Sequence, residues 1–111
     1  MAYTDFPFDD LEFVEINGTI DENGKITDGD GFSVTHKYPG VYIVKFDDSF
    51  IYEPPKITID VDGLSEGAVA RIIDENLKSF KYFTVQIDED NMTLEDFDIC
   101  FSAAGMREKK S

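Results

Sequence analysis

The chain has 111 residues, which is the size of one domain and too few for two. Acidic residues outnumber basic ones 24 to 10, and the formal net charge of −14 argues against nucleic acid or an anionic membrane as a partner. Hydrophobic residues make up 41% of the chain and include 10 Phe and 5 Tyr, which argues against an acidic disordered chain and is enough for a core.

No apolar run approaches the roughly 18 residues of a membrane span. The first residues, MAYTDFPFDD, lack the basic head and the apolar stretch of a signal peptide. We therefore expect no signal peptide and no membrane insertion. We expect the chain to be made in the cytoplasm, with assembly into a virion or onto a surface by a non-Sec route left open.

Apolar and polar residues alternate with a period of two along most of the chain, which is typical of β-strands. We expect an opening strand over 11–16 and a hairpin over 19–27. Its turn is placed at Asn23-Gly24, because this pair tolerates the positive φ angles of a type I′ turn. Further strands are expected over 32–37, 41–46, 56–62, 68–77, 82–88 and 97–103.

Some of these segments carry more specific expectations. The continuous apolar character of 41–46, VYIVKF, suggests burial on both faces. The segment 68–77 fits a two-turn helix or a strand, and its length and flanking strands favour the strand. In 82–88, Phe83 alternates against Thr84, and 88–95 is expected to be a polar turn. The closing strand places its apolar residues on one face: Phe97, Ile99, Phe101 and Ala103.

Seven or eight short strands at spacings of roughly 8–12 residues are typical of an antiparallel sandwich or barrel. We therefore predict an all-β fold, a single antiparallel β-sandwich over 18–105. An N-terminal segment, 1–17, is expected to be partly extended and a candidate for an interface. The basic tail, 106–111, is expected to be frayed.

Five aromatic residues exceed what a small two-layer core can bury, and surplus apolar surface predicts an interface. We therefore expect a homo-oligomer. The five are Phe6, Phe8, Phe13, Phe50 and Tyr52.

The single cysteine and the single histidine limit the chemistry of the chain. Cys100 cannot form an intrachain disulfide, and its apolar strand predicts a small buried core residue. His36 cannot by itself build a multi-histidine zinc site. A nucleophilic pair of the two is formally open but has no evident third group to orient it. Motifs for nucleotides, hydrolases and metalloproteases are absent from the sequence, so we expect no enzyme.

Three acidic stretches, 21–30, 60–66 and 88–98, could each hold a hard cation such as calcium. An EF-hand loop has Gly at its sixth position, whereas Gly24 is fourth when counted from Asp21. Solvated turns are therefore favoured over metal sites. We expect no cofactor and no metal, with structural calcium an open alternative that the loop spacing does not support.

Short motifs in chain order resemble a known sandwich. They are the hairpin GTIDENGKI, then GDGFSV, then Gly40, Tyr42, Val44 and Phe46, then Pro55, Ile57 and Ile59, then Phe83, Thr84 and Val85, and finally Ala103 to Gly105. Over about 18–105 the chain resembles the small β-sandwich domain at the receptor-binding tips of phage tail fibres and of related bacterial surface or injection-machine proteins. It is also similar to the H-type lectin sandwich.

The resemblance implies a trimer with ligand sites at subunit boundaries, and a glycan or cell-surface receptor as partner. Lectins of this family bind galactosamine-type sugars with an Arg on a mid-chain strand and an aromatic-rich motif around a Trp after the F-T-V strand. Arg71 is the candidate for the first role. The segment 87–94, IDEDNMTL, contains neither Trp nor His, so the aromatic platform is missing and the sugar specificity is not carried over.

Arg71, Asp88 and Asp90 are the candidate ligand-binding residues. An exposed ion pair with a nearby acid is the alternative role for Arg71, although Arg favours bidentate contacts at interfaces. The leading hypothesis is a non-enzymatic, trimeric β-sandwich for adhesion or receptor binding, with carbohydrate among its candidate ligands. The alternatives are a structural trimerisation module, a calcium-stabilised binding module and a monomeric acidic partner or inhibitor protein.

Overall fold

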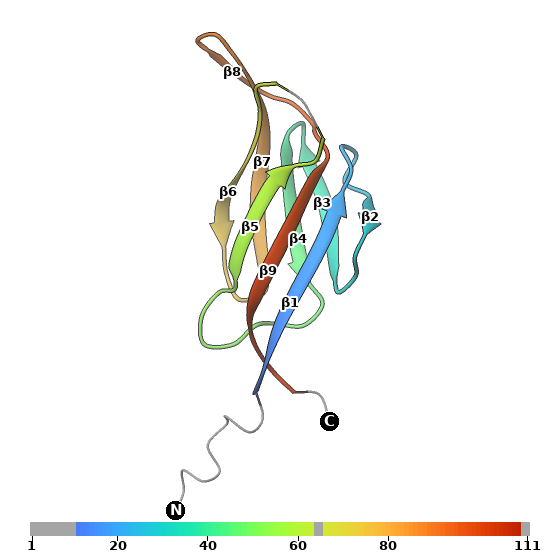
Figure 1. Cartoon of the computed structure of the whole chain (residues 1–111), viewed down its shortest axis with the longest axis vertical. Helices are drawn as coiled ribbons and strands as arrows, with labels where there is room; N and C mark the ends of the chain where they lie inside the picture. Colours follow the sequence, from blue (N-terminus) through green and yellow to red (C-terminus); the bar gives the residue numbers. More distant parts are fainter. Residues whose placement is uncertain (1–10, 64–65, 110–111) are drawn as a thin grey trace, which may run out of the picture.

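The computed structural model describes residues 11–63 and 66–109, which form nine β-strands in two antiparallel sheets (Figure 1). Sheet A has the strand order β2-β1-β9-β5, with β1 at Leu11–Ile20, β2 at Ile26–Asp28, β5 at Lys56–Val61 and β9 at Ile99–Glu108. Sheet B has the order β3-β4-β7-β6, with β3 at Phe32–Tyr38, β4 at Val41–Phe46, β6 at Ala68–Glu75 and β7 at Ser79–Asp88. Strand β8, Asn91–Leu94, pairs with the end of β7. The predicted all-β sandwich is confirmed.

The core lies between the two sheets and is rich in aromatic rings. Alternate residues of β4 and β7 point into it, among them Tyr42, Phe80 and Tyr82, each at most 1% exposed. Sheet A contributes Ile20, Ile99 and other apolar side chains from the opposite layer. Each fully buried side chain of this size contributes about 1.5–3 kcal/mol relative to its exposed state. Among the described residues, no helix is long and apolar enough to cross a membrane.

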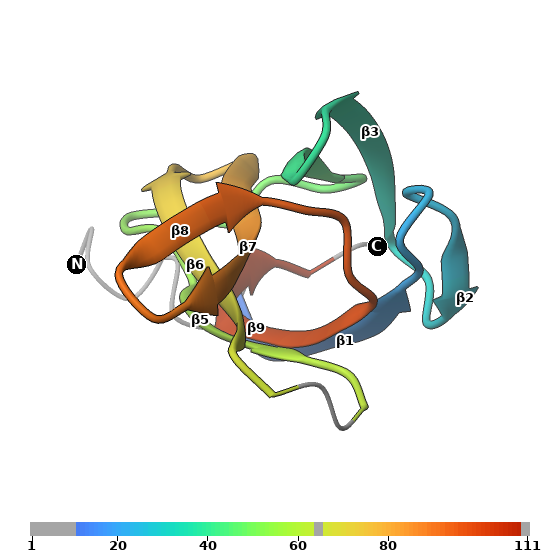
Figure 2. The same cartoon turned by 90° about the horizontal axis from the view of Figure 1, so that it is seen from above.

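Strands β1 and β9 pair over ten residues, from Leu11 opposite Glu108 to Ile20 opposite Ile99. The start of β1 and the end of β9 lie together at one pole of the sandwich, and the β7–β8 hairpin projects from the opposite pole (Figure 1). Viewed end-on from the hairpin pole, β1, β9 and β5 follow one another in one layer (Figure 2). The sandwich therefore extends beyond the predicted limits of 18–105, because 11–17 pair with 102–108.

The predicted 19–27 hairpin is present, but its turn differs from type I′. Gly24 has a φ of 87°, whereas Asn23 is not among the positive-φ residues that a type I′ turn would require. One carboxylate oxygen of Asp21 accepts hydrogen bonds from the backbone N–H groups of Asn23 and Lys25, both at 2.9 Å. These bonds close the loop after β1. The strand itself continues to Ile20, without the break expected after residue 16, because it pairs with β9 along its whole length.

The aromatic residues expected to exceed the capacity of the core differ in their burial. Phe50 is fully buried, with its ring edge-on to Phe46 at a centroid distance of 5.1 Å, so the connector after β4 contributes to the core and no interface is needed to cover it. Phe13 and Tyr52 are both 69% exposed. Phe6 and Phe8 lie outside the described residues.

Two strands bury different faces from those expected. In β4 only one face is fully buried, because Ile43 is half-buried and Lys45 is exposed. In β7 the core side carries Thr84, which is fully buried, while Phe83 is half-buried on the outer side. The Thr84 hydroxyl donates to the backbone carbonyl of Glu95 at 2.6 Å, and this hydrogen bond offsets the cost of burying it.

The structure also decides the ambiguous segment 68–77 and corrects the predicted turn over 88–95. The segment 68–77 contains the strand β6, as favoured, and not a helix. The segment expected to be a polar turn, 88–95, contains β8, so β7 and β8 form a hairpin that turns at Glu89 and Asp90. Glu89 has a φ of 52° in this turn.

Candidate functional site

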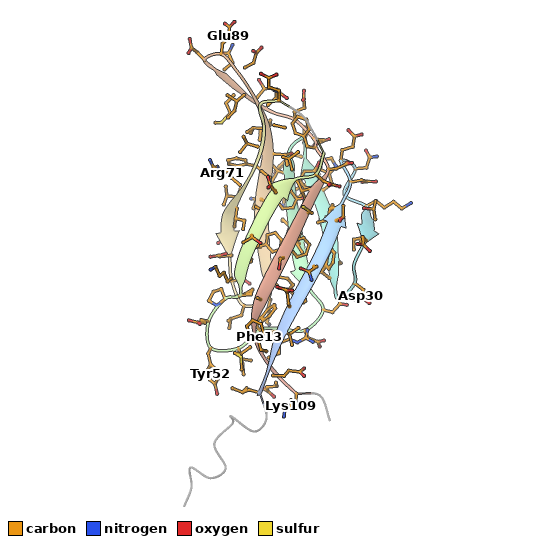
Figure 3. The ribbon with its side chains drawn as sticks, in the orientation of Figure 1. Phe13, Asp30, Tyr52, Arg71, Glu89 and Lys109 are labelled. Atoms are coloured by element: carbon orange, nitrogen blue, oxygen red, sulfur yellow. The ribbon has the colours of Figure 1, made fainter. Side chains whose placement is uncertain are left out.

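The three predicted ligand-binding residues do not form one site. Arg71 lies opposite Phe83 in the β6–β7 ladder, whereas Asp88 lies five residues further along β7 and Asp90 lies in the hairpin turn. Five residues of strand span about 17 Å. Figure 3 shows the same separation between Arg71, midway along the sandwich, and Glu89 at the hairpin tip. No carboxylate among the described residues forms an ion pair with Arg71.

A shallow groove lies instead on the outer face of sheet A and has a volume of about 430 Å³. Strand β9 forms its centre and carries the small side chains of Cys100 and Ser102, with β1 and β5 on either side. The lining residues are Asn17, Gly18, Thr19, Asp28, Thr58, Ile59, Asp60, Cys100, Phe101 and Ser102.

The strand register orders the polar side chains of the groove in two cross-strand rows. The first row contains Asp28, Thr19, Cys100 and Asp60, and the second contains Asn17, Ser102 and Thr58. Three strand spacings separate the two carboxylates at the ends of the first row, which is about 14 Å. The groove thus offers hydroxyl and amide groups in its middle and negative charge at both ends, with no Lys or Arg in its lining.

Cys100 is exposed on this outer face, so the expectation of a buried core cysteine is wrong. Partial burial, with the carboxylates of Asp62 and Asp60, raises the pKa of the thiol and keeps it protonated at neutral pH. His36 packs against Tyr42 on the inner side of sheet B. The two residues therefore lie on different sheets, and the formal Cys–His nucleophilic pair does not form.

A stack of three rings, two of them fully buried and that of His36 partly exposed, lies inside the sandwich toward the hairpin pole. The rings of His36, Tyr42 and Tyr82 stack nearly parallel, with centroid distances of 4.4 Å and 4.8 Å. Asp96, from the segment between β8 and β9, accepts a hydrogen bond from the backbone N–H of Gly40 and pairs with His36 Nε2 at 2.9 Å. These contacts fasten that segment to the β3–β4 turn.

The two tyrosine hydroxyls of this cluster differ in their partners. Tyr42 donates to the backbone carbonyl of Glu22 at 2.6 Å, whereas the buried Tyr82 hydroxyl has no hydrogen-bond partner among the described residues. Burial raises the pKa of both phenols far above the ordinary value of 10.0, and nearby acids add to the effect. Both tyrosine hydroxyls are therefore neutral in the working pH range.

Several carboxylates of the acidic stretches accept hydrogen bonds from backbone N–H groups. Asp21 holds its own loop, and Asp98 accepts a hydrogen bond from the N–H of Glu22 at 2.7 Å, which ties the β1–β2 loop to the segment before β9. Among the described residues, no group of three or more His, Cys, Asp or Glu side chains is arranged to hold a metal ion.

Comparisons of the chain with models of known protein families, with curated proteins and with solved structures give no match. The similarity to the H-type lectin sandwich therefore stays a prediction from sequence. The functional proposal rests on the geometry of the groove on the outer face of sheet A.

The residues of the groove were not predicted as a site, although their signal is present in the sequence. The alternation that places Ile99, Phe101 and Ala103 inward also places Cys100 and Ser102 outward, in β9. In β5 the same alternation turns Thr58 and Asp60 outward. What the sequence did not show is that β9 lies between β1 and β5, which brings these residues together.

Proposed function

We propose that the chain is a non-enzymatic adhesion or receptor-binding module that holds a glycan in the groove of sheet A and works as a homo-oligomer. The observation that carries the proposal is the groove itself, an open hollow lined by hydroxyl, amide and carboxylate groups. A volume of about 430 Å³ is within the range of small-ligand sites. The trimer implied by the lectin-like motifs is the expected oligomer.

The charge of the groove limits which glycans it would accept. Asp28 and Asp60 stand at its two ends, and the lining contains no basic residue. Sialylated or sulfated glycans would be repelled, whereas neutral or amino sugars can donate hydroxyl or ammonium hydrogens to these carboxylates. Thr19 and Thr58 offer further hydrogen bonds to sugar hydroxyls, and Ser102, whose hydroxyl donates to Glu15 at 3.3 Å, can accept one.

Two features of the groove favour binding over catalysis. Glycoside hydrolysis needs two carboxyl groups about 5–9.5 Å apart, whereas the strand register puts the Asp28 and Asp60 backbones about 14 Å apart. The thiol of Cys100, which lies between them, has a raised pKa and is therefore a poor nucleophile at neutral pH.

A glycan array followed by calorimetry tests the proposal. We expect binding to neutral or amino-sugar glycans and none to sialylated or sulfated ones. Ser102→Phe fills the groove from an outward strand position, so it should abolish binding. Glu53→Phe, at an exposed position of the connector between β4 and β5 and outside both sheets, is the control and should keep the wild-type affinity.

The possible results separate the functional classes. Binding that survives Ser102→Phe in a folded variant would place the ligand elsewhere and refute the groove. An array without any bound glycan would refute the carbohydrate part. An oligomer without a ligand would then favour a structural trimerisation module, and a monomer without a ligand would favour an acidic partner protein.

A further inference from the structure

The outer face of sheet B carries a continuous apolar surface, here called the apolar band. Because Phe80, Tyr82 and Thr84 of β7 point into the core, the odd-numbered residues of β7 point outward. The ladders with β4, β6 and β8 place further apolar residues beside them. The band consists of Tyr38, Val41, Val69, Phe83, Val85, Ile87, Met92 and Leu94.

Val85 shows that these side chains pack against one another. It is only 3% exposed and yet does not belong to the core cluster between the sheets. Val69 and Leu94 are its partners in the two neighbouring strands. The rest of the band faces outward, with Met92 66%, Tyr38 59% and Leu94 49% exposed.

The charge of this face is opposite to that of the whole chain. Its paired outward positions carry Lys45, Lys81 and Arg71 and one carboxylate, Asp74. The chain as a whole has 24 acidic residues against 10 basic ones. The face is thus apolar and basic on a protein whose other surfaces are acidic, so it would attract the acidic flank of another copy.

Carboxylates that could meet these cations flank the face itself. Glu75 lies at the end of β6, and the tip of the β7–β8 hairpin carries three consecutive acids at 88–90. In a symmetric assembly the same flanks are presented by the neighbouring copy. Arg71, which has no ion-pair partner within the described chain, is exposed at this edge.

The size of the face suits a stable association. Four adjacent strands at about 4.8 Å are about 19 Å wide, and the ten residues of β7 are about 34 Å long, which gives about 650 Å² in projection. A stable protein interface buries about 800 Å² per partner. Side-chain relief makes the accessible area larger than the projection, so the face alone nearly supplies this area.

We infer that copies of this chain associate with each other through the outer face of sheet B, with the apolar band at the centre of the contact. The inference names the surface through which the proposed homo-oligomer forms. It rests on the proposed function, which is the source of the expectation that the chain is an oligomer. The groove on sheet A, on the other side of the sandwich, stays open to a ligand.

The test is the solution mass by light scattering after size exclusion, as a function of protein concentration. The wild type should have a solution mass at least twice the monomer mass of 12.6 kDa. The double variant Met92→Glu, Leu94→Glu should run as a monomer, because burying uncompensated carboxylates should weaken association at least about hundredfold. Phe13→Glu, at a 69% exposed position on β1 of the other sheet, is the matched control and should keep the wild-type mass.

Several results would overturn the inference. A wild-type monomer at all concentrations would do so, and so would a double variant that keeps the wild-type mass while its circular dichroism shows a folded protein. An association lost in Phe13→Glu and kept in the double variant would move the contact to sheet A. Glycan binding by a monomer would refute this interface while leaving the groove proposal intact.

Discussion

Replacing Tyr82 by Phe should stabilise the protein. The ring of Tyr82 is fully buried and stacks on Tyr42 at 4.8 Å, and its hydroxyl has no hydrogen-bond partner among the described residues. Phenylalanine keeps the ring and its stacking and removes only the oxygen. The native state would therefore lose a polar atom that was desolvated without compensation.

The size of the gain follows from the cost of such an atom. A buried polar group without a partner costs about 1–3 kcal/mol, so Tyr82→Phe should raise the free energy of unfolding by about 1–2 kcal/mol. For a domain of this size, about 1 kcal/mol corresponds to about 4 °C in Tm. Urea unfolding and thermal melting followed by circular dichroism would measure both quantities.

Tyr42→Phe is the matched control, because the same change at the neighbouring ring removes a hydroxyl that donates to the carbonyl of Glu22. It should lower the free energy of unfolding by about 1–2 kcal/mol, since a bond is lost and a carbonyl is left without its donor. If Tyr82→Phe were as destabilising as Tyr42→Phe, the Tyr82 hydroxyl would have a partner and the reasoning would fail.

Other predictions concern pH and packing. Burial raises the pKa of Tyr82 and Tyr42 in the folded state above the ordinary value of 10.0. The free energy of unfolding should therefore stay constant with respect to these two groups below pH 10 and fall as the pH rises beyond it, because only the unfolded chain ionises there. Urea midpoints should show this fall, and the double Phe variant should show a smaller one. Burial alone would raise the pKa of Asp96, but its hydrogen bonds hold the pKa below 3.8. Its stabilising effect on the fold is therefore present above pH 3.8 and lost as the pH falls below that value. Asp96→Asn should reduce the loss of stability at acid pH, and an equal loss in the variant would contradict this role for Asp96. Gly18→Ala would drive a methyl group into the ring of Phe32 and should cost about 1–3 kcal/mol in urea unfolding; wild-type stability would show that the ring can move aside.

The sequence predicted the strands well because most of them alternate with a period of two. The weaker predictions came where that pattern is equivocal. In β7, Phe83 and Thr84 suggested an apolar and a polar face, but the Thr84 hydroxyl finds a partner in a segment eleven residues later, and this allows it to be buried. Local pattern carries no information about such a partner.

The surfaces were harder to predict than the core. The lectin-like resemblance predicts Arg71 as a ligand contact, with Asp88 and Asp90 beside it, but the ladder of β6, β7 and β8 separates the arginine from the two acids. The apolar band depends on β8, which follows a polar turn and adds Met92 and Leu94 beside β7. A strand of four residues that follows a polar turn gives only a weak alternation in the sequence, so its pairing with β7 is seen only in the folded chain.

The position of β9 between β1 and β5 has a consequence for synthesis on the ribosome. Sheet B can assemble once β8 has emerged, but β1 and β5 have no common neighbour until the last strand is made. Before that moment the nascent chain exposes two open strand edges, and such edges invite pairing with other chains. A stalled or clipped product that ends before Ile99 should therefore aggregate, and a chaperone that shields strand edges should help this protein most during the final steps of translation.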